Sequence, residues 1–311
     1  MGKVAFLFAG QGSQVVGMGK EIYETYEIAR EFFDRACQLV DFDMKKLCFE
    51  GPLEQLSQTE YTQACLVACE MMALKVLKAH SIISDICAGL SLGEYSALVA
   101  AGALDAYDAV RLVRVRGQIM SEALPKGISS MAAVLGMQAD DLEAICQELT
   151  DSGVVEIANY NCPGQLVIGG EIEAVNIASE LAIERGARKV KALNVSSAFH
   201  TSLLKDAGTK LRKELEKVDF NDLKIPVVFN KTAKYQYEPL VDLLETQVYS
   251  SVRFEASIRL MLEEGVTTFI EIGPGKTLSS FVKKIDRKVN IYQVEDVVGI
   301  NKLVEQLGGN E

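Results

Sequence analysis

A serine between two glycines lies where a predicted strand meets a predicted helix. The apolar residues 85–90 are typical of a short buried strand, and residues 92–101 have helix composition. Ser91 therefore falls on the turn, between Gly89 and Gly93, which we expect to let the backbone turn sharply. This arrangement is a nucleophile elbow, in which an exposed hydroxyl lies beside the first amides of a helix. The pattern predicts that Ser91 is a catalytic nucleophile.

A serine hydroxyl needs a base, and the chain has only two histidines. His80 lies near the end of a helix predicted over 62–80, where an imidazole simply complements the helix dipole. His200 follows the last strand of a predicted inserted domain, at the point where the chain returns to the larger domain. His200 is therefore the predicted general base. Acidic residues are numerous, so the sequence does not select one that orients it.

Arg116 occupies an unusual position in the helix predicted over 105–123. At about 100° per residue it falls in the middle of an apolar face. That face is formed by Leu112, Val113, Ile119 and Met120. A buried guanidinium needs a partner, which could be an internal Asp or Glu, or the side chain could reach out to water. The functional alternative is a bidentate clamp for a substrate carboxylate, and the pattern alone does not separate these interpretations.

The glycine-rich loop 10–14 follows the first predicted strand, 3–8. A dinucleotide-binding fingerprint would require glycine where the chain has Val15, so that function is excluded. A loop at this place can instead contribute a backbone N–H group to an oxyanion hole.

Strands and helices alternate along most of the chain, which predicts an α/β fold with a mainly parallel sheet. Strands of this sheet are predicted at 3–8, 85–90, 226–230 and 268–272. The middle of the chain has instead the order β-α-β-β-α-β of a ferredoxin-like unit. Its strands are predicted at 130–135, 154–159, 165–168 and 189–193, and its helices at 140–149 and 172–185. We therefore predict an α/β-hydrolase-like catalytic domain (1–126 and 197–311), an inserted ferredoxin-like subdomain (127–196), and an active site between them.

The composition limits the partners and the compartment. A formal net charge of −11 disfavours nucleic acid and anionic membranes as partners. Two basic clusters could be either solvated surface or docking sites; they are 185, 188, 189 and 191, and 283, 284, 287 and 288. No apolar run reaches the ~18 residues that span a membrane. The seven cysteines are odd in number, and no signal peptide is recognisable, which favours reduced thiols in a cytoplasm. No cysteine cluster lies near either histidine, so no metal site is expected.

Several motifs in one order extend this interpretation. They are FAGQGSQ at 8–14, GLSLGEY at 89–95, RG at 116–117, ANYNCPGQ at 158–165, SAFHT at 197–201 and EIGPGK at 271–276. Over nearly its whole length the chain resembles the malonyl-CoA:acyl carrier protein transacylases of type II fatty acid synthesis. The resemblance implies a cytoplasmic acyltransferase with a ping-pong mechanism.

In that mechanism, Ser91 would attack the thioester carbonyl of malonyl-CoA, with His200 as the base. The backbone N–H groups of Gln11 and Leu92 would hold the oxyanion, and Arg116 would pair with the free malonyl carboxylate. The phosphopantetheine thiol of holo acyl carrier protein would then take the malonyl group. The resemblance implies no metal or cofactor, because the CoA thioester is a substrate and the partner carries the phosphopantetheine.

The resemblance also assigns less obvious residues. A backbone carbonyl, here that of Gln247, would orient the histidine in place of an aspartate. Phe199 resembles the malonyl-selective form of the motif and is expected to contact the substrate. Asn159 and Asn161 match a polar pocket without an assigned step. Leu90 departs from the family, since many members have histidine there; we expect catalysis to survive, with altered hydrogen bonding and pH response near the nucleophile.

Two other functions share part of this pattern. A serine esterase or thioesterase would use the same elbow, but it would gain nothing from a buried Arg116 and would have to admit water. A non-catalytic carrier-binding protein would be expected to lack Ser91, His200 or Arg116, and all three are present. A transacylase that serves polyketide assembly would use the same chemistry, so these residues leave the pathway open.

Overall fold

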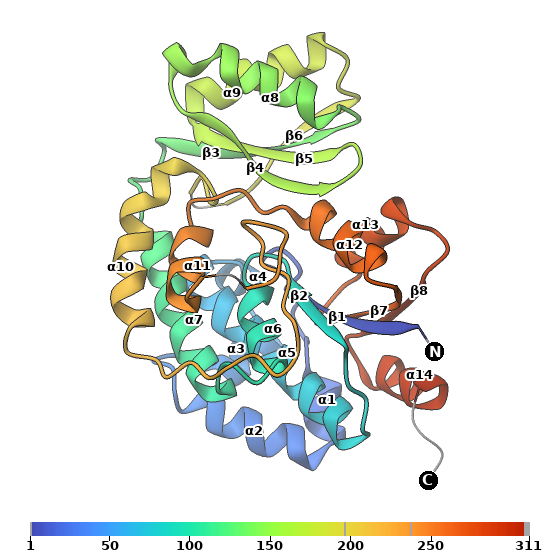
Figure 1. Ribbon diagram of the computed structural model, residues 1–311. Coiled ribbons are helices and arrows are strands. Elements are labelled where there is room, and N and C mark those ends of the chain that lie inside the picture. The colour runs from blue at the N-terminus through green and yellow to red at the C-terminus, as the bar shows by residue number, and fades with distance from the viewer. Residues whose placement is uncertain (1, 196, 237, 308–311) are drawn as a thin grey trace.

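The computed structural model describes residues 2–195, 197–236 and 238–307 (Figure 1). Its larger part is built on a parallel sheet of order β2-β1-β7-β8. These strands are β1 (Lys3–Phe8), β2 (Ile86–Gly89), β7 (Val266–Ile272) and β8 (Asn290–Val294). Phe8 at the end of β1 pairs with Gly89 at the end of β2, so the loops that follow both strands meet at one edge of the sheet. This carboxyl edge is where ligands bind in open α/β sheets.

Strand β1 shows why the sheet is covered on both faces. Its side chains alternate between two apolar clusters, with Phe6 and Phe8 in one and Ala5 and Leu7 in the other. Strands buried on both faces are typical of parallel sheets.

Helices supply the rest of both clusters. On the Phe6 and Phe8 side, α5 (Thr59–Ala79) packs against α7 (Ala106–Ser121), α6 (Gly93–Ala100) and α2 (Glu27–Cys37). The opposite cluster is formed with α12 (Phe254–Glu263) and α13 (Thr277–Ile285). The remaining helices are α1 (Lys20–Thr25), α3 (Met44–Glu50), α4 (Leu53–Leu56), α10 (Lys205–Leu215), α11 (Leu240–Gln247) and α14 (Val297–Leu307).

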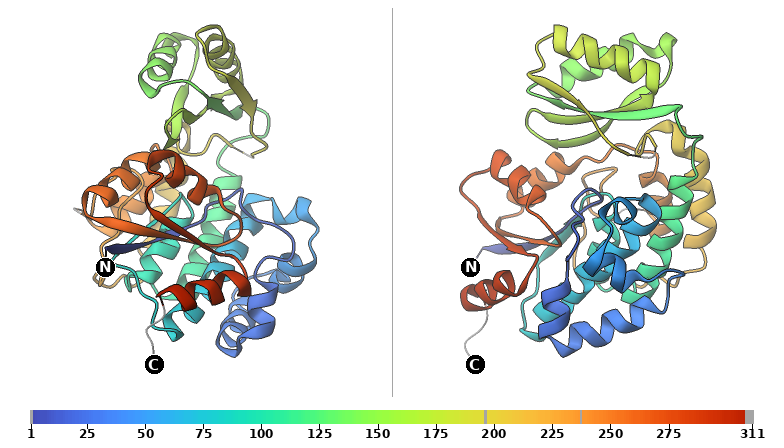
Figure 2. Two further views of the ribbon diagram at one scale, coloured as in Figure 1. Left: turned by 90° about the vertical axis from the view of Figure 1, so that its right-hand side faces the viewer. Right: turned by 180° about the vertical axis from the view of Figure 1, so that it is seen from behind.

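A second, antiparallel sheet has the order β4-β5-β3-β6. Its strands are β3 (Ser129–Leu135), β4 (Val155–Cys162), β5 (Gln165–Glu171) and β6 (Lys189–Ala192). Helices α8 (Ala139–Glu148) and α9 (Ile172–Glu184) pack on it around a separate apolar cluster. The two helices cover the face turned away from the larger part, so the bare face of the sheet looks toward the parallel sheet (Figures 1 and 2). The predicted α/β fold with a ferredoxin-like unit is confirmed.

The strand predicted at 226–230 is wrong, because this segment makes only two isolated bridges, a parallel one between Val227 and Cys87 and an antiparallel one between Phe229 and Lys234. The backbone of Asn230 donates to a side chain, and Phe229 is engaged in a turn with Ala233, so neither continues a ladder. The sequence analysis also did not predict β8. The predicted end of the insert, at position 196, lies outside the described residues.

Candidate active site

The backbone at Ser91 is held in a strained conformation between β2 and α6. Its φ is +52°, in the left-handed region that residues other than glycine rarely adopt. The glycines on either side have a different role from the one expected. A Cβ on Gly89 would lie 1.9 Å from the carbonyl carbon of Gly93, and a Cβ on Gly93 would lie 2.2 Å from the Phe8 carbonyl oxygen. The glycines therefore permit close packing, while Ser91 itself makes the turn.

Asn230 fastens this elbow from a distant part of the chain. Its Oδ1 accepts a hydrogen bond from the Ser91 amide at 2.6 Å, and its Nδ2 donates to the Gly89 carbonyl at 2.7 Å. The backbone N–H group of Asn230 in turn donates to Glu94 Oε2 at 2.6 Å. Neither Asn230 nor Glu94 was predicted as a site residue from the sequence. Glu94 stands in the quoted elbow motif, whereas no local pattern marks Asn230.

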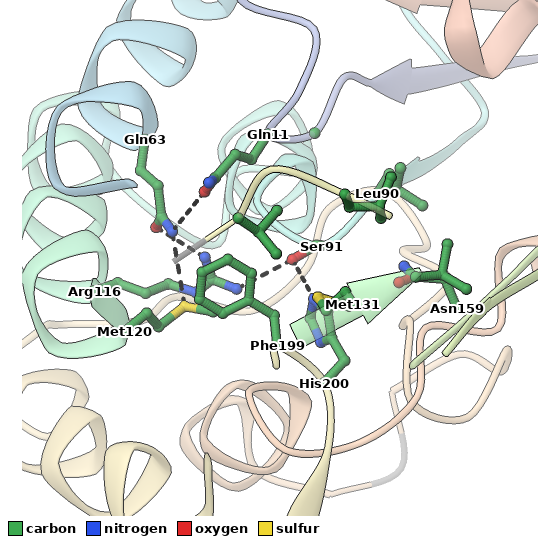
Figure 3. Close-up of a pocket in the computed structure, with 14 residues that line it drawn as sticks. Gln11, Gln63, Leu90, Ser91, Arg116, Met120, Met131, Asn159, Phe199 and His200 are labelled. Atoms are coloured by element: carbon green, nitrogen blue, oxygen red, sulfur yellow. Dashed lines mark hydrogen bonds between the residues drawn. The ribbon is translucent and has the colours of Figure 1, made fainter. Parts of the chain in front are cut away.

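The structure brings together Ser91 and His200, the predicted nucleophile and the predicted base. The Ser91 hydroxyl lies 2.7 Å from His200 Nε2 (Figure 3). On the other side of the ring, His200 Nδ1 lies 2.9 Å from the carbonyl oxygen of Gln247. A carbonyl can only accept, so Nδ1 carries the proton and Nε2 is left to accept from the serine. The structure thus places the Gln247 carbonyl where the resemblance implied it. His80 instead caps the end of α5.

Burial lowers the pKa of His200 to about 4, and the positive charge of Arg116 acts in the same direction. The carbonyl of Gln247 partly opposes this shift by accepting a hydrogen bond from the Nδ1–H group. The imidazole is therefore neutral at pH 7 and can take a proton from Ser91.

Arg116 is 1% exposed, its guanidinium carbon lies 5.2 Å from the centroid of the Tyr95 ring, and its hydrogen-bond acceptors among the described residues are neutral oxygens. Its Nη1 donates to Gln63 Oε1 at 2.8 Å, and its Nη2 donates to Gln247 Oε1 at 3.0 Å and to Ser91 Oγ at 3.3 Å. Burial lowers the pKa of Arg116 from its usual value. No described carboxylate forms a direct ion pair with Arg116, and its side chain does not reach water; the nearest carboxylate in its network, Glu94, lies one amide away.

A cavity of about 130 Å³ joins these groups. Ser91, His200, Arg116 and Phe199 line it, and Met131 on β3 closes it from the second sheet (Figure 3). The site therefore lies between the two sheets.

A second cavity, of about 280 Å³, shares several of the residues that line the first. Leu90 and Asn159 line both, whereas Asn161 lines the second only. Leu90 thus presents an apolar side chain where many relatives would have an imidazole.

The two amides expected in the oxyanion hole flank this site. Gln11 follows β1 and lines the cavity, with its side-chain Nε2 donating to Thr59 Oγ1 at 2.9 Å. Leu92 directly follows Ser91 and is the N-cap of α6. Neither backbone N–H group donates a hydrogen bond within the described parts of the chain, so both can serve an oxyanion.

Comparisons with known proteins identify the family of this chain. The family described as acyl transferase domain matches residues 5–306. Malonyl CoA-acyl carrier protein transacylase from Bacillus subtilis is 46% identical over 310 residues, which cover 99% of this chain and 98% of that protein. The chain belongs to the malonyl-CoA:acyl carrier protein transacylase family. It is an acyltransferase.

Solved structures of other family members share the fold. The transacylase from Clostridium perfringens superposes with a TM-score of 0.95 at 44% identity, covering 98% of this chain and 97% of that one. A malonyl-transacylase in complex with its type II PKS acyl carrier protein gives a TM-score of 0.95 at 34% identity, covering 98% of this chain and 99% of that one.

Gly93→Ala is expected to abolish nucleophile reactivity, because the new methyl group must push α6 away from the Phe8 carbonyl. The measurement is the rate at which a neutral fluorophosphonate labels Ser91, together with the free energy of unfolding in urea. The control is Gly186→Ala, where φ is +99° but a Cβ would meet nothing within 4 Å. It should lose about 1 kcal/mol of stability and keep its labelling rate. Normal labelling of Gly93→Ala would contradict this account of the elbow.

Arg116→Met is expected to move the acid limb of Ser91 labelling to higher pH. Arg116 lowers the pKa of His200, so its removal raises that pKa and the base is protonated earlier as the pH falls. The measurement is the fluorophosphonate labelling rate between pH 4 and 8. Arg114→Met, on the same helix but paired with Asp41, should keep the wild-type profile. Identical midpoints in all three proteins would refute the electrostatic coupling.

Proposed function

We propose that the chain transfers the malonyl group from malonyl-CoA to the phosphopantetheine thiol of acyl carrier protein, and so supplies fatty acid elongation. A covalent malonyl–Ser91 ester is the intermediate. The observation that carries the proposal is that Ser91, His200 and an arginine without a carboxylate partner within the described residues line one buried cavity. The names of the relatives support the same substrates.

In the first half-reaction, Ser91 Oγ attacks the thioester carbonyl as its proton moves to His200 Nε2. The amides of Gln11 and Leu92 hold the oxyanion, and collapse of the tetrahedral intermediate breaks the C–S bond. The proton on His200 then goes to the departing CoA sulfur.

The second half-reaction runs the same steps toward the carrier protein. His200 takes the proton of the phosphopantetheine thiol, and the sulfur attacks the ester carbonyl. The C–O bond to Ser91 breaks, and the proton returns to the serine. His200 accepts and then donates the proton in each half-reaction, and the proposed chemistry uses neither a metal nor a cofactor.

Arg116 would select the malonyl group by pairing with its free carboxylate, and Phe199 would close the pocket beside it. A charge-assisted hydrogen bond contributes about 1.5–3 kcal/mol, and acetyl-CoA cannot form it. An esterase has no use for this pairing, which separates the proposal from hydrolysis.

We further propose that residues 127–196 form a distinct subdomain and that the enzyme works in the cytoplasm, without nucleic acid or membrane as partner. All seven cysteines are unpaired, which supports a reducing compartment. None of the described helices is both long and apolar enough to cross a bilayer. Within the described ranges, no group of three or more His, Cys, Asp or Glu side chains could hold a metal ion.

Arg116→Ala should lower the transfer rate from malonyl-CoA about 10- to 100-fold more than the rate from acetyl-CoA, since only malonyl carries the carboxylate. The measurement is kcat/KM for both donors with a holo acyl carrier protein. Arg114→Ala, which removes an arginine paired with Asp41, should leave the ratio of the two values unchanged. The proposal fails if Arg116→Ala reduces both rates equally.

A further inference from the structure

The side chain of Gln247 separates two buried, oppositely charged groups. Its Oε1 accepts from Arg116 Nη2 at 3.0 Å, and its Nε2 donates to Glu94 Oε1 at 3.0 Å and to the Ser91 carbonyl at 2.9 Å. Arg116, Glu94 and Gln247 are each 1% exposed. Donors on one side and acceptors on the other fix the orientation of the amide, because a flipped amide would face like groups.

Each carboxylate oxygen of Glu94 accepts a hydrogen bond, and neither of the two donors is Arg116. One of its oxygens accepts from Gln247 and the other from the Asn230 amide. The carboxylate offsets the cost of burying the guanidinium charge, yet it lies one amide away. A direct ion pair would instead satisfy the guanidinium and compete with any incoming carboxylate.

We propose that the Gln247 side chain is a positioning residue that determines substrate specificity. It holds Arg116 beside Ser91 and keeps Glu94 from pairing with it, so that the guanidinium stays available to the carboxylate of the acyl group. This inference rests on the proposed function, in which Arg116 recognises that carboxylate. The backbone carbonyl of Gln247 orients His200, so the same residue serves both selectivity and catalysis.

A charge swap tests the proposal. In the double variant Glu94→Gln/Gln247→Glu the net charge is unchanged, and one hydrogen bond can still join the two side chains. The position 94 oxygen can still accept from the Asn230 amide. The carboxylate at position 247, however, now pairs directly with Arg116. The assays run at pH 8, because burial raises the pKa of Glu94 in the wild type to about 7.

We expect KM for malonyl-CoA to rise at least about tenfold in the double variant, so that kcat/KM for malonyl-CoA falls by that factor. The value of kcat/KM for acetyl-CoA should fall much less. The swap also replaces the hydrogen bond to the Ser91 carbonyl with two acceptors that face each other. We expect this change to affect both donors alike and to cancel in the malonyl-to-acetyl ratio of kcat/KM. Arg116→Ala, measured in parallel, sets the ratio expected when the clamp is absent.

A wild-type ratio in the double variant, with a collapsed ratio in Arg116→Ala, would overturn the role of Gln247 and leave the proposed function intact. A wild type that does not distinguish the donors would overturn both. If the double variant does not fold, Gln247→Met replaces it, since this change removes the amide and keeps the backbone carbonyl at His200. The same rise in KM for malonyl-CoA supports the proposal, and an unchanged KM overturns it.

Discussion

The electrostatics of the site follow from one buried guanidinium that has no carboxylate against it within the described parts of the chain. Burial, together with the charge of Arg116, lowers the pKa of His200, so the imidazole stays neutral, and Arg116 also donates to the Ser91 hydroxyl. A bare charge in this position costs free energy, which neutral acceptors and a carboxylate one amide away partly offset. Under the proposed function, the same charge would assist the nucleophile and stay available to an acidic substrate.

The strained turn at Ser91 depends on a second set of contacts. Close packing of Gly89 and Gly93 brings α6 against the ends of β1 and β2. The Asn230 side chain holds the turn with two hydrogen bonds, one to the Gly89 carbonyl and one from the Ser91 amide. Because Glu94 joins Asn230 to Gln247, the elbow and the arginine clamp share one hydrogen-bond network. A change on either side is therefore expected to affect both reactivity and selectivity.

Local patterns predicted three of the groups that the structure brings together around one cavity. Ser91 stood in a short motif at a strand–helix junction, His200 was the only histidine outside a helix end, and Arg116 interrupted an apolar helix face. The fold class followed from the order of elements. Gln247, in contrast, was reached only through the family resemblance, since a backbone carbonyl leaves no trace in residue type.

Long-range contacts set the limit of sequence reasoning. Asn230 lies 139 positions from Ser91, and nothing near it indicates the contact. Its segment was predicted as a strand, whereas it pairs with β2 only at one bridge and then turns, with the backbone N–H of Asn230 donating to Glu94. The role of the two glycines was also misjudged, because the close approach of Phe8 to Gly93 is visible only in three dimensions.

The most direct test of the central claim is the intact mass of the protein after mixing with malonyl-CoA, and in parallel with acetyl-CoA. The account predicts a single malonyl adduct on Ser91, little or none from acetyl-CoA, and discharge of the adduct by the thiol of a holo acyl carrier protein. Steady release of CoA without an adduct would contradict it in favour of hydrolysis. If neither an adduct nor released CoA is detected, the result would contradict the assignment of malonyl-CoA as the donor.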